Sequence, residues 1–300
     1  MRSRSPLDAL SLVLGSVDAV RNVRALYVLL TTFALAGLLT AMAQGSLVRG
    51  AATPGALQAA AALFVAFYGG SAAGILTMDD ARGVPVREIG DALRAALSSA
   101  HRLIVALAAI AIGYAALGAL LVALLWLARA DVAGETLGSW LFGALVPVAV
   151  VAVGLAMLAG VAVVVPLAAP GVWAGARAGA LVRQLWRWTR FHLLKVALLM
   201  AAVSLLTAGV GVLASFVVVS GGRVVAQLAT QVAGIDVPPA LLMAGLFGRG
   251  AGPALQSPHA AAALVGEGVV FALALVLPGL VYLRGTCSVY LAMCEDSPDV

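Results

Sequence analysis

The sequence predicts an all-α integral membrane protein, a bundle of six transmembrane helices with three amphipathic interfacial helices on the cytoplasmic side. The 300 residues are 63% hydrophobic and only 10% charged, whereas soluble domains are about 25% charged. Long uncharged runs alternate with short segments that hold nearly all the ionisable residues. This small number of charges cannot cover the surface of a water-soluble fold of this length. A water-soluble globular protein is therefore excluded.

Six apolar runs are each long enough to cross a hydrocarbon core about 30 Å thick. They cover residues 25–44, 55–78, 103–127, 142–165, 196–219 and 269–292. A further apolar stretch from Pro238 to Gly248 is too short to cross, so we expect an interfacial or re-entrant piece within 221–267. Asp8 and Asp18 interrupt the first 24 residues, which argues against a cleavable signal peptide.

The basic residues predict the orientation of the chain. Of the 18 Lys and Arg residues, 14 fall on the side of the membrane that holds the N-terminus, the second and fourth connecting segments and the C-terminus. By the positive-inside rule, both termini are cytoplasmic. The excess of Arg over Lys and the abundance of Ala, Gly, Val and Leu are typical of a GC-rich bacterial genome. We therefore expect a multi-pass protein of the bacterial inner membrane.

A threefold repeat organises the single membrane domain. Candidate units cover 6–80, 85–166 and 170–296, and each has an amphipathic segment followed by two spans. Pro6, Pro85 and Pro170 open the three segments. Such segments are expected to lie flat at the cytoplasmic interface, with the apolar face in the acyl boundary or against the bundle.

The third segment has the clearest separation of faces. Arg183, Arg187 and Arg190 fall within about 60° of one another on a helix, opposite an apolar face. The run from Trp186 to Phe191 suits the headgroup layer, since indoles prefer that layer and Arg binds lipid phosphate. The candidate lipid or partner contacts are Arg183, Arg187, Arg190, Trp186, Trp188 and Arg284.

Three kinds of partner are open for this surface. They are membrane lipids with anionic headgroups, a membrane-protein partner, and a second copy of the chain. Ordinary interfacial anchoring is the alternative to specific recognition. Nucleic acid is not expected despite the pI near 9.8, because the basic residues follow the positive-inside rule.

The spans are nearly free of charge. Only Arg284 lies within one, in the sixth. Because proton relays and ion pathways need intramembrane ionisable groups, charge-coupled transport is not expected. Arg284 either extends to the cytoplasmic headgroups or binds Asp79 or Asp80.

Small residues suit close packing of the helices. Gly171, Gly175 and Gly179 are spaced as a tandem GxxxG and are a candidate docking face. Cys287 and Cys294 fall on one face of the last span, where we expect them to fill space rather than to form a disulfide.

A weak candidate polar site consists of Asp79, Asp80 and Arg82. This Asp-Asp-Ala-Arg segment resembles a fragment of the CDP-alcohol phosphotransferase signature, but the further aspartates of that signature are missing. We therefore expect a solvated helix end with Arg82 as neighbour. Serine protease, P-loop and zinc motifs are also missing, so no catalytic, cofactor or metal residue is assigned.

These observations favour a non-enzymatic scaffold, assembly factor or accessory subunit. The alternative is a permease or lipid-handling protein for an uncharged or lipid-like substrate, with a cavity between the spans that contain Pro147 and Pro278. A weaker alternative is a lipid-modifying enzyme around Asp79, Asp80 and Arg284.

Overall fold

A computed structural model describes residues 14–129, 134–231 and 258–295. Every regular element in these ranges is helical, and six helices are long and apolar enough to cross a membrane. These six are Val23–Val48, Ala52–Ala81, Ile89–Leu127, Thr136–Trp173, Leu193–Val225 and Ala274–Glu295. The predicted spans are confirmed, and the chain is a helical multi-pass membrane protein.

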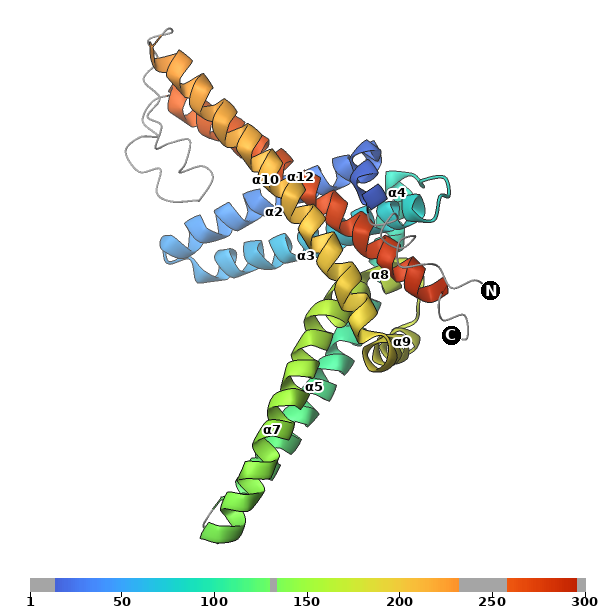
Figure 1. Ribbon diagram of the computed structural model, residues 1–300. Helices are drawn as coiled ribbons and strands as arrows, with labels where there is room; N and C mark the ends of the chain where they lie inside the picture. Colours follow the sequence, from blue (N-terminus) through green and yellow to red (C-terminus); the bar gives the residue numbers. More distant parts are fainter. Residues whose placement is uncertain (1–13, 130–133, 232–257, 296–300) are drawn as a thin grey trace. The chain divides into compact units, whose positions relative to one another are not determined.

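The helices drawn in Figure 1 belong to two compact units. One unit holds Leu14–Leu93 and Val203–Gly285, and the other holds Arg94–Ala202 and residues 286–295. The elements in chain order are η1 (Gly15–Arg21), α2 (Val23–Val48), α3 (Ala52–Ala81), α4 (Ile89–Ser99), α5 (His101–Leu127), α7 (Glu135–Ala159), the π-helical turn η2 (Gly160–Val164), α8 (Val165–Trp173), α9 (Ala178–Phe191), α10 (Leu193–Gln231) and α12 (Pro258–Glu295).

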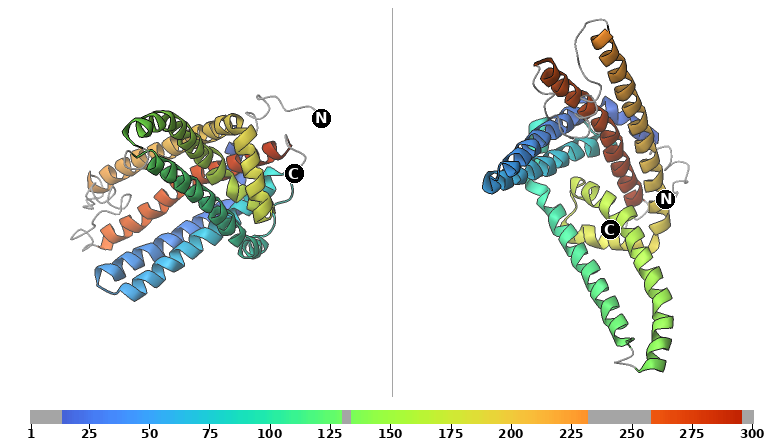
Figure 2. Two further views of the ribbon diagram at one scale, coloured as in Figure 1. Left: turned by 90° about the horizontal axis from the view of Figure 1, so that it is seen from below. Right: turned by 90° about the vertical axis from the view of Figure 1, so that its left-hand side faces the viewer.

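In the first unit, α2 and α3 form an antiparallel hairpin, and the two helices lie side by side in both views of Figure 2. Gly50, with φ at 77°, makes the tight turn between them. A Cβ on Gly69 would fall 2.2 Å from Thr32 Oγ1, so only glycine lets the two helices approach this closely. Near the turn, the Ser46 hydroxyl donates to Gln58 Oε1 at 2.9 Å.

The C-terminal helix α12 packs against α10 in the same unit. A Cβ on Gly285 would lie 2.7 Å from Val203, which again marks a backbone in close contact with a neighbouring helix. Further along, Gly211 of α10 faces Pro278 of α12, and a Cβ on Gly211 would lie 3.7 Å from the Pro278 side chain. Small residues therefore set this second helix contact as well.

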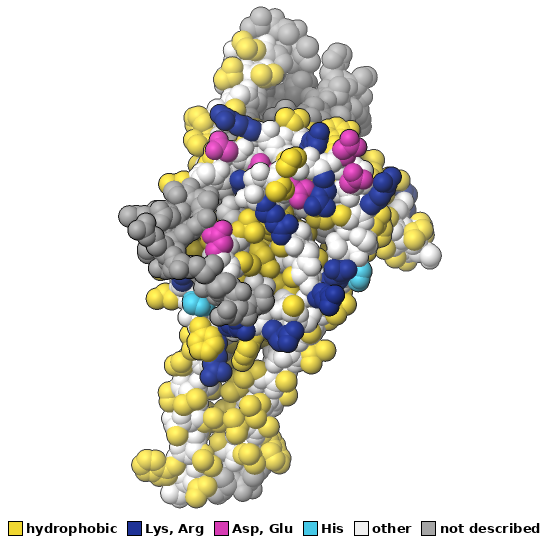
Figure 3. Space-filling model, turned by 90° about the vertical axis from the view of Figure 1, so that its right-hand side faces the viewer, with side chains coloured by type: hydrophobic (Ala, Val, Ile, Leu, Met, Phe, Trp, Pro, Cys, Tyr) yellow, Lys and Arg dark blue, Asp and Glu magenta, His cyan; other side chains and the backbone are white. Residues whose placement is uncertain are grey.

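In the second unit, a hydrogen bond from Tyr114 Oη to the carbonyl of Ala156, at 2.8 Å, joins α5 to α7, and the right-hand view of Figure 2 shows the two helices at an angle to each other. Within this unit, the other described helices cover little of α5 and α7. Only 6% of the most apolar stretch of the span Ile89–Leu127 is buried. Hydrophobic side chains cover the pair where it projects at the lower end of Figure 3.

The fourth span is longer than the sequence predicts. Instead of ending at residue 165, the helix continues through η2 and α8 to Trp173. Pro166 does not end it because this proline occupies the first turn of α8, where its missing N–H costs little. Pro170 lies inside α8, so the third amphipathic helix begins at Ala178 and not at Pro170.

The expected tandem GxxxG face does not form. Gly171 belongs to α8 and Gly179 to α9, while Gly175 lies between the two helices with φ at 94°. The three glycines therefore share no helix face.

Helices occupy the second and third predicted amphipathic segments, as α4 and α9. In the first segment the structure describes η1, and residues 1–13 lie outside the described ranges. Helix α10 continues to Gln231, beyond the predicted end at residue 219. The apolar stretch 238–248 also lies outside the described residues.

Candidate functional site

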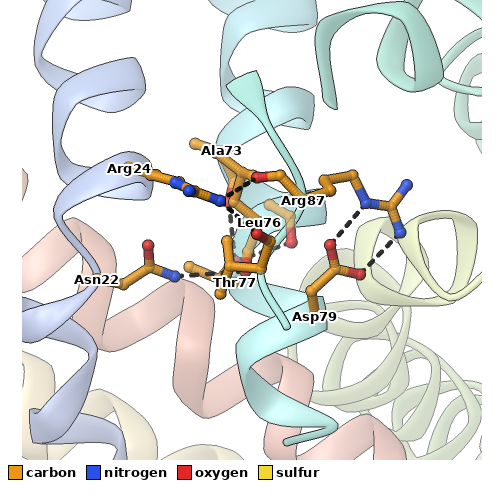
Figure 4. A network of polar contacts seen from close by, with 9 residues as sticks. Asn22, Arg24, Ala73, Leu76, Thr77, Asp79 and Arg87 are labelled. Atoms are coloured by element: carbon orange, nitrogen blue, oxygen red, sulfur yellow. Dashed lines mark hydrogen bonds and ion pairs between the residues drawn. The ribbon is translucent and has the colours of Figure 1, made fainter. Parts of the chain in front are cut away.

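A polar cluster lies at the C-terminal end of α3, within the first unit. Its members come from the start of α2, the last turn of α3, the segment before α4, and α12 (Figure 4 shows most of them). We call this set the α3-end cluster, and it consists of Asn22, Arg24, Asp79, Asp80, Arg87 and Arg284.

Asp79 and Arg87 form the centre of the α3-end cluster. Arg87 Nε donates to Asp79 Oδ2 at 2.6 Å, and Arg87 Nη2 donates to Asp79 Oδ1 at 2.7 Å. This two-bond geometry is the strongest that an arginine makes with a carboxylate. The Asp79 side chain is only 4% exposed, whereas that of Arg87 is 39% exposed.

The charge of Arg87 is stabilised by this contact. The hydrogen bond to Asp79 raises the pKa of Arg87 above its usual value, and the negative charges of Asp79 and Asp91 add to the effect against the opposing cost of desolvation. Arg87 therefore stays protonated, and the buried carboxylate keeps its counter-charge.

Asn22 and Arg24 attach the start of α2 to the same place. Asn22 Oδ1 accepts from the backbone N–H of Ala25 at 3.1 Å and so caps α2, while its Nδ2 donates to the carbonyl of Leu76 at 3.4 Å. Arg24 Nη1 donates to the carbonyls of Val86 and Arg87. These bonds hold the segment before α4 against both α2 and α3.

Arg284 contacts Asp80 rather than extending alone to the headgroups. Its Nη1 lies 2.9 Å from Asp80 Oδ2, with the two side chains 20% and 35% exposed. The contact is an ion pair and not a hydrogen bond, because the buried Nη1 makes no hydrogen bond of acceptable direction in the described structure. It connects α12 to the end of α3.

The candidate polar site therefore differs from the solvated helix end that the sequence suggests. Arg82 is exposed at the C-cap of α3, while Asp79 and Asp80 each face another arginine. A metal ion at either carboxylate would have to displace a guanidinium. Among the described residues, no three His, Cys, Asp or Glu side chains are placed to hold a metal.

The second candidate region is α9, in the other unit. Its inner face consists of Leu181, Gln184, Leu185 and Trp188, which are all buried. Arg183, Arg187 and Arg190 lie on the exposed face. Trp186 and Phe191 are 68% and 67% exposed. The predicted separation of polar and apolar faces is thus present, with the apolar face packed on the protein.

Trp188 lies apart from the other candidate contacts of this region. It is fully buried and meets the ring of Tyr290 edge-on, with ring centroids 5.5 Å apart. Beside it, Gln184 accepts from Tyr290 Oη at 3.1 Å and donates to Cys294 Sγ at 3.2 Å. These contacts fasten α9 to the end of α12.

Helical spacing alone predicts Arg87 on the polar stripe of the second amphipathic segment, and it indicates no contact for Asn22 or Arg24. The structure places Arg87 before α4, bonded back to Asp79. The available signal was the turn after α3, where Gly83 has φ at 69° and Pro85 follows. Such a turn lets the chain fold back over the last turn of α3.

Comparisons with protein families, with characterised proteins and with solved structures found no match to this chain.

Proposed function

We propose that the protein is a non-enzymatic scaffold or accessory subunit of a bacterial inner membrane, with both termini in the cytoplasm. One observation carries this proposal: the α5–α7 pair presents apolar side chains to its surroundings along most of its length. The described helices of its own unit use little of that surface, so it is suited to contact with lipids and with the spans of another protein.

Open glycines on this surface favour a helical partner over lipid alone. A Cβ on Gly143 or Gly154 of α7 would meet nothing within 4 Å. The two positions are eleven residues apart, which places them on one face of a helix. Spans associate in lipid where small residues allow close backbone approach, so this face is suited to another span.

The α3-end cluster supports a structural role for the polar residues. Each of its carboxylates already faces a guanidinium, and its other polar groups bond to backbone carbonyls or to a helix N-terminus. This arrangement joins helices, and it offers a substrate no uncompensated acid or base. It therefore weakens the lipid-modifying alternative around Asp79, Asp80 and Arg284.

The permease alternative has no specific observation in its favour. Pro278 packs against Gly211 of α10. An open depression lined by Ser139, Trp140, Gly143 and Ala144 lies on one side of α7 alone.

Site-specific photo-crosslinking in intact membranes tests the accessory role. We would place the photoreactive residue at Val150, which is 66% exposed on α7, with fully buried Val163 as the control position. A single protein adduct of defined mass at Val150 and none at Val163 is expected, and G143L/G154L should abolish it. Only lipid adducts at Val150, together with recovery of the chain as a lone monomer, would overturn the proposal.

A further inference from the structure

We infer that the exposed face of α9, formed by Arg183, Arg187, Arg190, Trp186 and Phe191, is a binding surface for acidic phospholipid headgroups. This inference does not depend on the accessory role proposed above. It follows from the placement of α9, the lack of counter-charges around its arginines, and the pattern of aromatic side chains beside them.

Helix α9 is held close to a membrane surface by its neighbours. It lies between the span that ends at Trp173 and the span that begins at Leu193. Four residues connect it to the first, and His192 alone connects it to the second. A helix of 14 residues on such short connections cannot move far from the headgroup layer.

The inner face of α9 is already occupied. Leu181, Leu185 and Trp188 are buried, and a Cβ on Gly171 of α8 would fall 2.3 Å from the Leu181 side chain. The apolar face therefore packs on the protein's own helices and does not insert into the acyl chains, as a free interfacial helix would. What α9 offers to an outside partner is its arginine face.

No carboxylate of the described structure neutralises these arginines. Arg183, Arg187 and Arg190 form no ion pair with a described residue, and the guanidinium of Arg190 stacks on Phe191, 5.4 Å from the ring centroid. The sequence around α9 is also poor in acids, with no Asp or Glu between Glu135 and Asp236. The arginines at the end of α3 differ, since Arg87 and Arg284 each face an aspartate.

The aromatic side chains make the partner a lipid rather than an acidic protein. On a helical projection the three arginines occupy the middle of the exposed arc, with Trp186 on one edge and Phe191 on the other. Exposed aromatic rings settle at the boundary between headgroups and acyl chains, and arginine binds the phosphate beside them. Both requirements are met by one acidic phospholipid layer.

Native mass spectrometry of the full chain in detergent tests the inference, with phosphatidylglycerol and phosphatidylcholine of matched acyl chains as probes. Each arginine near an anionic surface is worth about a fivefold gain in affinity. We expect R183Q/R187Q/R190Q to lower the preference for phosphatidylglycerol about tenfold or more. The matched control R21Q/R49Q/R223Q, which removes three exposed arginines elsewhere, should leave that preference unchanged.

Two outcomes for these arginine variants would overturn the inference. The first is an unchanged preference in R183Q/R187Q/R190Q, and the second is an equal loss in the control, which would show an effect of net charge alone. Unchanged helical content by circular dichroism establishes that the variants are folded.

The acidic residues Asp296 and Asp299 follow α12 in the sequence and are a competing occupant. If they cover the arginines, the full chain shows no preference for phosphatidylglycerol and D296N/D299N creates one, which would refute a surface that is open to lipid.

A fluorescence measurement checks contact directly. Trp186 is exposed and Trp188 is buried, although they are two residues apart. Brominated phosphatidylglycerol in vesicles should quench part of the tryptophan emission, and W186F should lower that part to the share that comes from exposed Trp126 and Trp140. Equal quenching in W186F and the parent protein would exclude lipid contact at α9.

Discussion

Replacing Arg87 with alanine is expected to destabilise the first unit strongly, because it removes the counter-charge of Asp79. Both guanidinium hydrogen bonds, at 2.6 and 2.7 Å, disappear in this variant. The carboxylate that remains is 4% exposed, so water cannot replace them without a local rearrangement.

The magnitude follows from the burial of the two partners. Breaking a fully buried ion pair costs about 3 to 5 kcal/mol. Since the Arg87 side chain is 39% exposed, water reaches this side of the contact and lowers the cost. We expect the free energy of unfolding to fall by about 2 to 3 kcal/mol in R87A.

Two variants make this expectation specific. The double variant D79L/R87L removes the buried charge as well as its partner, so it should recover most of the loss. Arg21 is 87% exposed and lies 4.0 Å from Asp18, which is 75% exposed, so R21A should change stability by less than about 0.5 kcal/mol.

The assay is unfolding of the purified chain in detergent by increasing dodecyl sulfate, followed by circular dichroism. The reasoning is refuted if R87A matches R21A, or if the double variant is less stable than R87A. Either result would mean that the Asp79–Arg87 contact does not carry the stability of the α3 end.

Two further predictions concern packing. Because a Cβ at position 69 would lie 2.2 Å from Thr32 Oγ1, G69A should destabilise the α2–α3 hairpin by about 1 to 3 kcal/mol in the same assay. Its control G70A, where nothing lies within 4 Å, should be near neutral. Trp188 is fully buried, so W188A should cost about 3 to 5 kcal/mol through the cavity it leaves, while W186A at the exposed neighbour should cost less than about 0.5 kcal/mol.

Hydropathy predicted the six spans because the property it measures, an uncharged run of sufficient length, is local in the sequence. The same method misplaced the end of the fourth span. A proline usually ends a helix, but the π-helical turn at Gly160–Val164 places Pro166 in the first turn of α8, where a proline is tolerated. That outcome depends on backbone geometry and is not visible in composition.

The candidate site was predicted only in part for a related reason. The charges of Asp79, Asp80 and Arg284 marked them as unusual, but their partners are set by folding. Arg284 meets an aspartate more than two hundred residues away in the sequence, and Arg87 returns to Asp79 through a turn. Single-sequence reasoning has no measure of such contacts, since neither helical spacing nor hydropathy connects the two members.

Whether an aspartate lies nearby distinguishes the arginines that join helices from the arginines that lie exposed on the surface. Where Asp79 and Asp80 are present, Arg87 and Arg284 face them and join helices. Across the hundred residues between Glu135 and Asp236 no acid is present, and the arginines of α9 lie exposed. A charge excess of this kind is stable at a surface only beside an external anion or in water. The positive-inside rule counts all these arginines alike, whereas the structure divides them into internal cross-links and a basic surface.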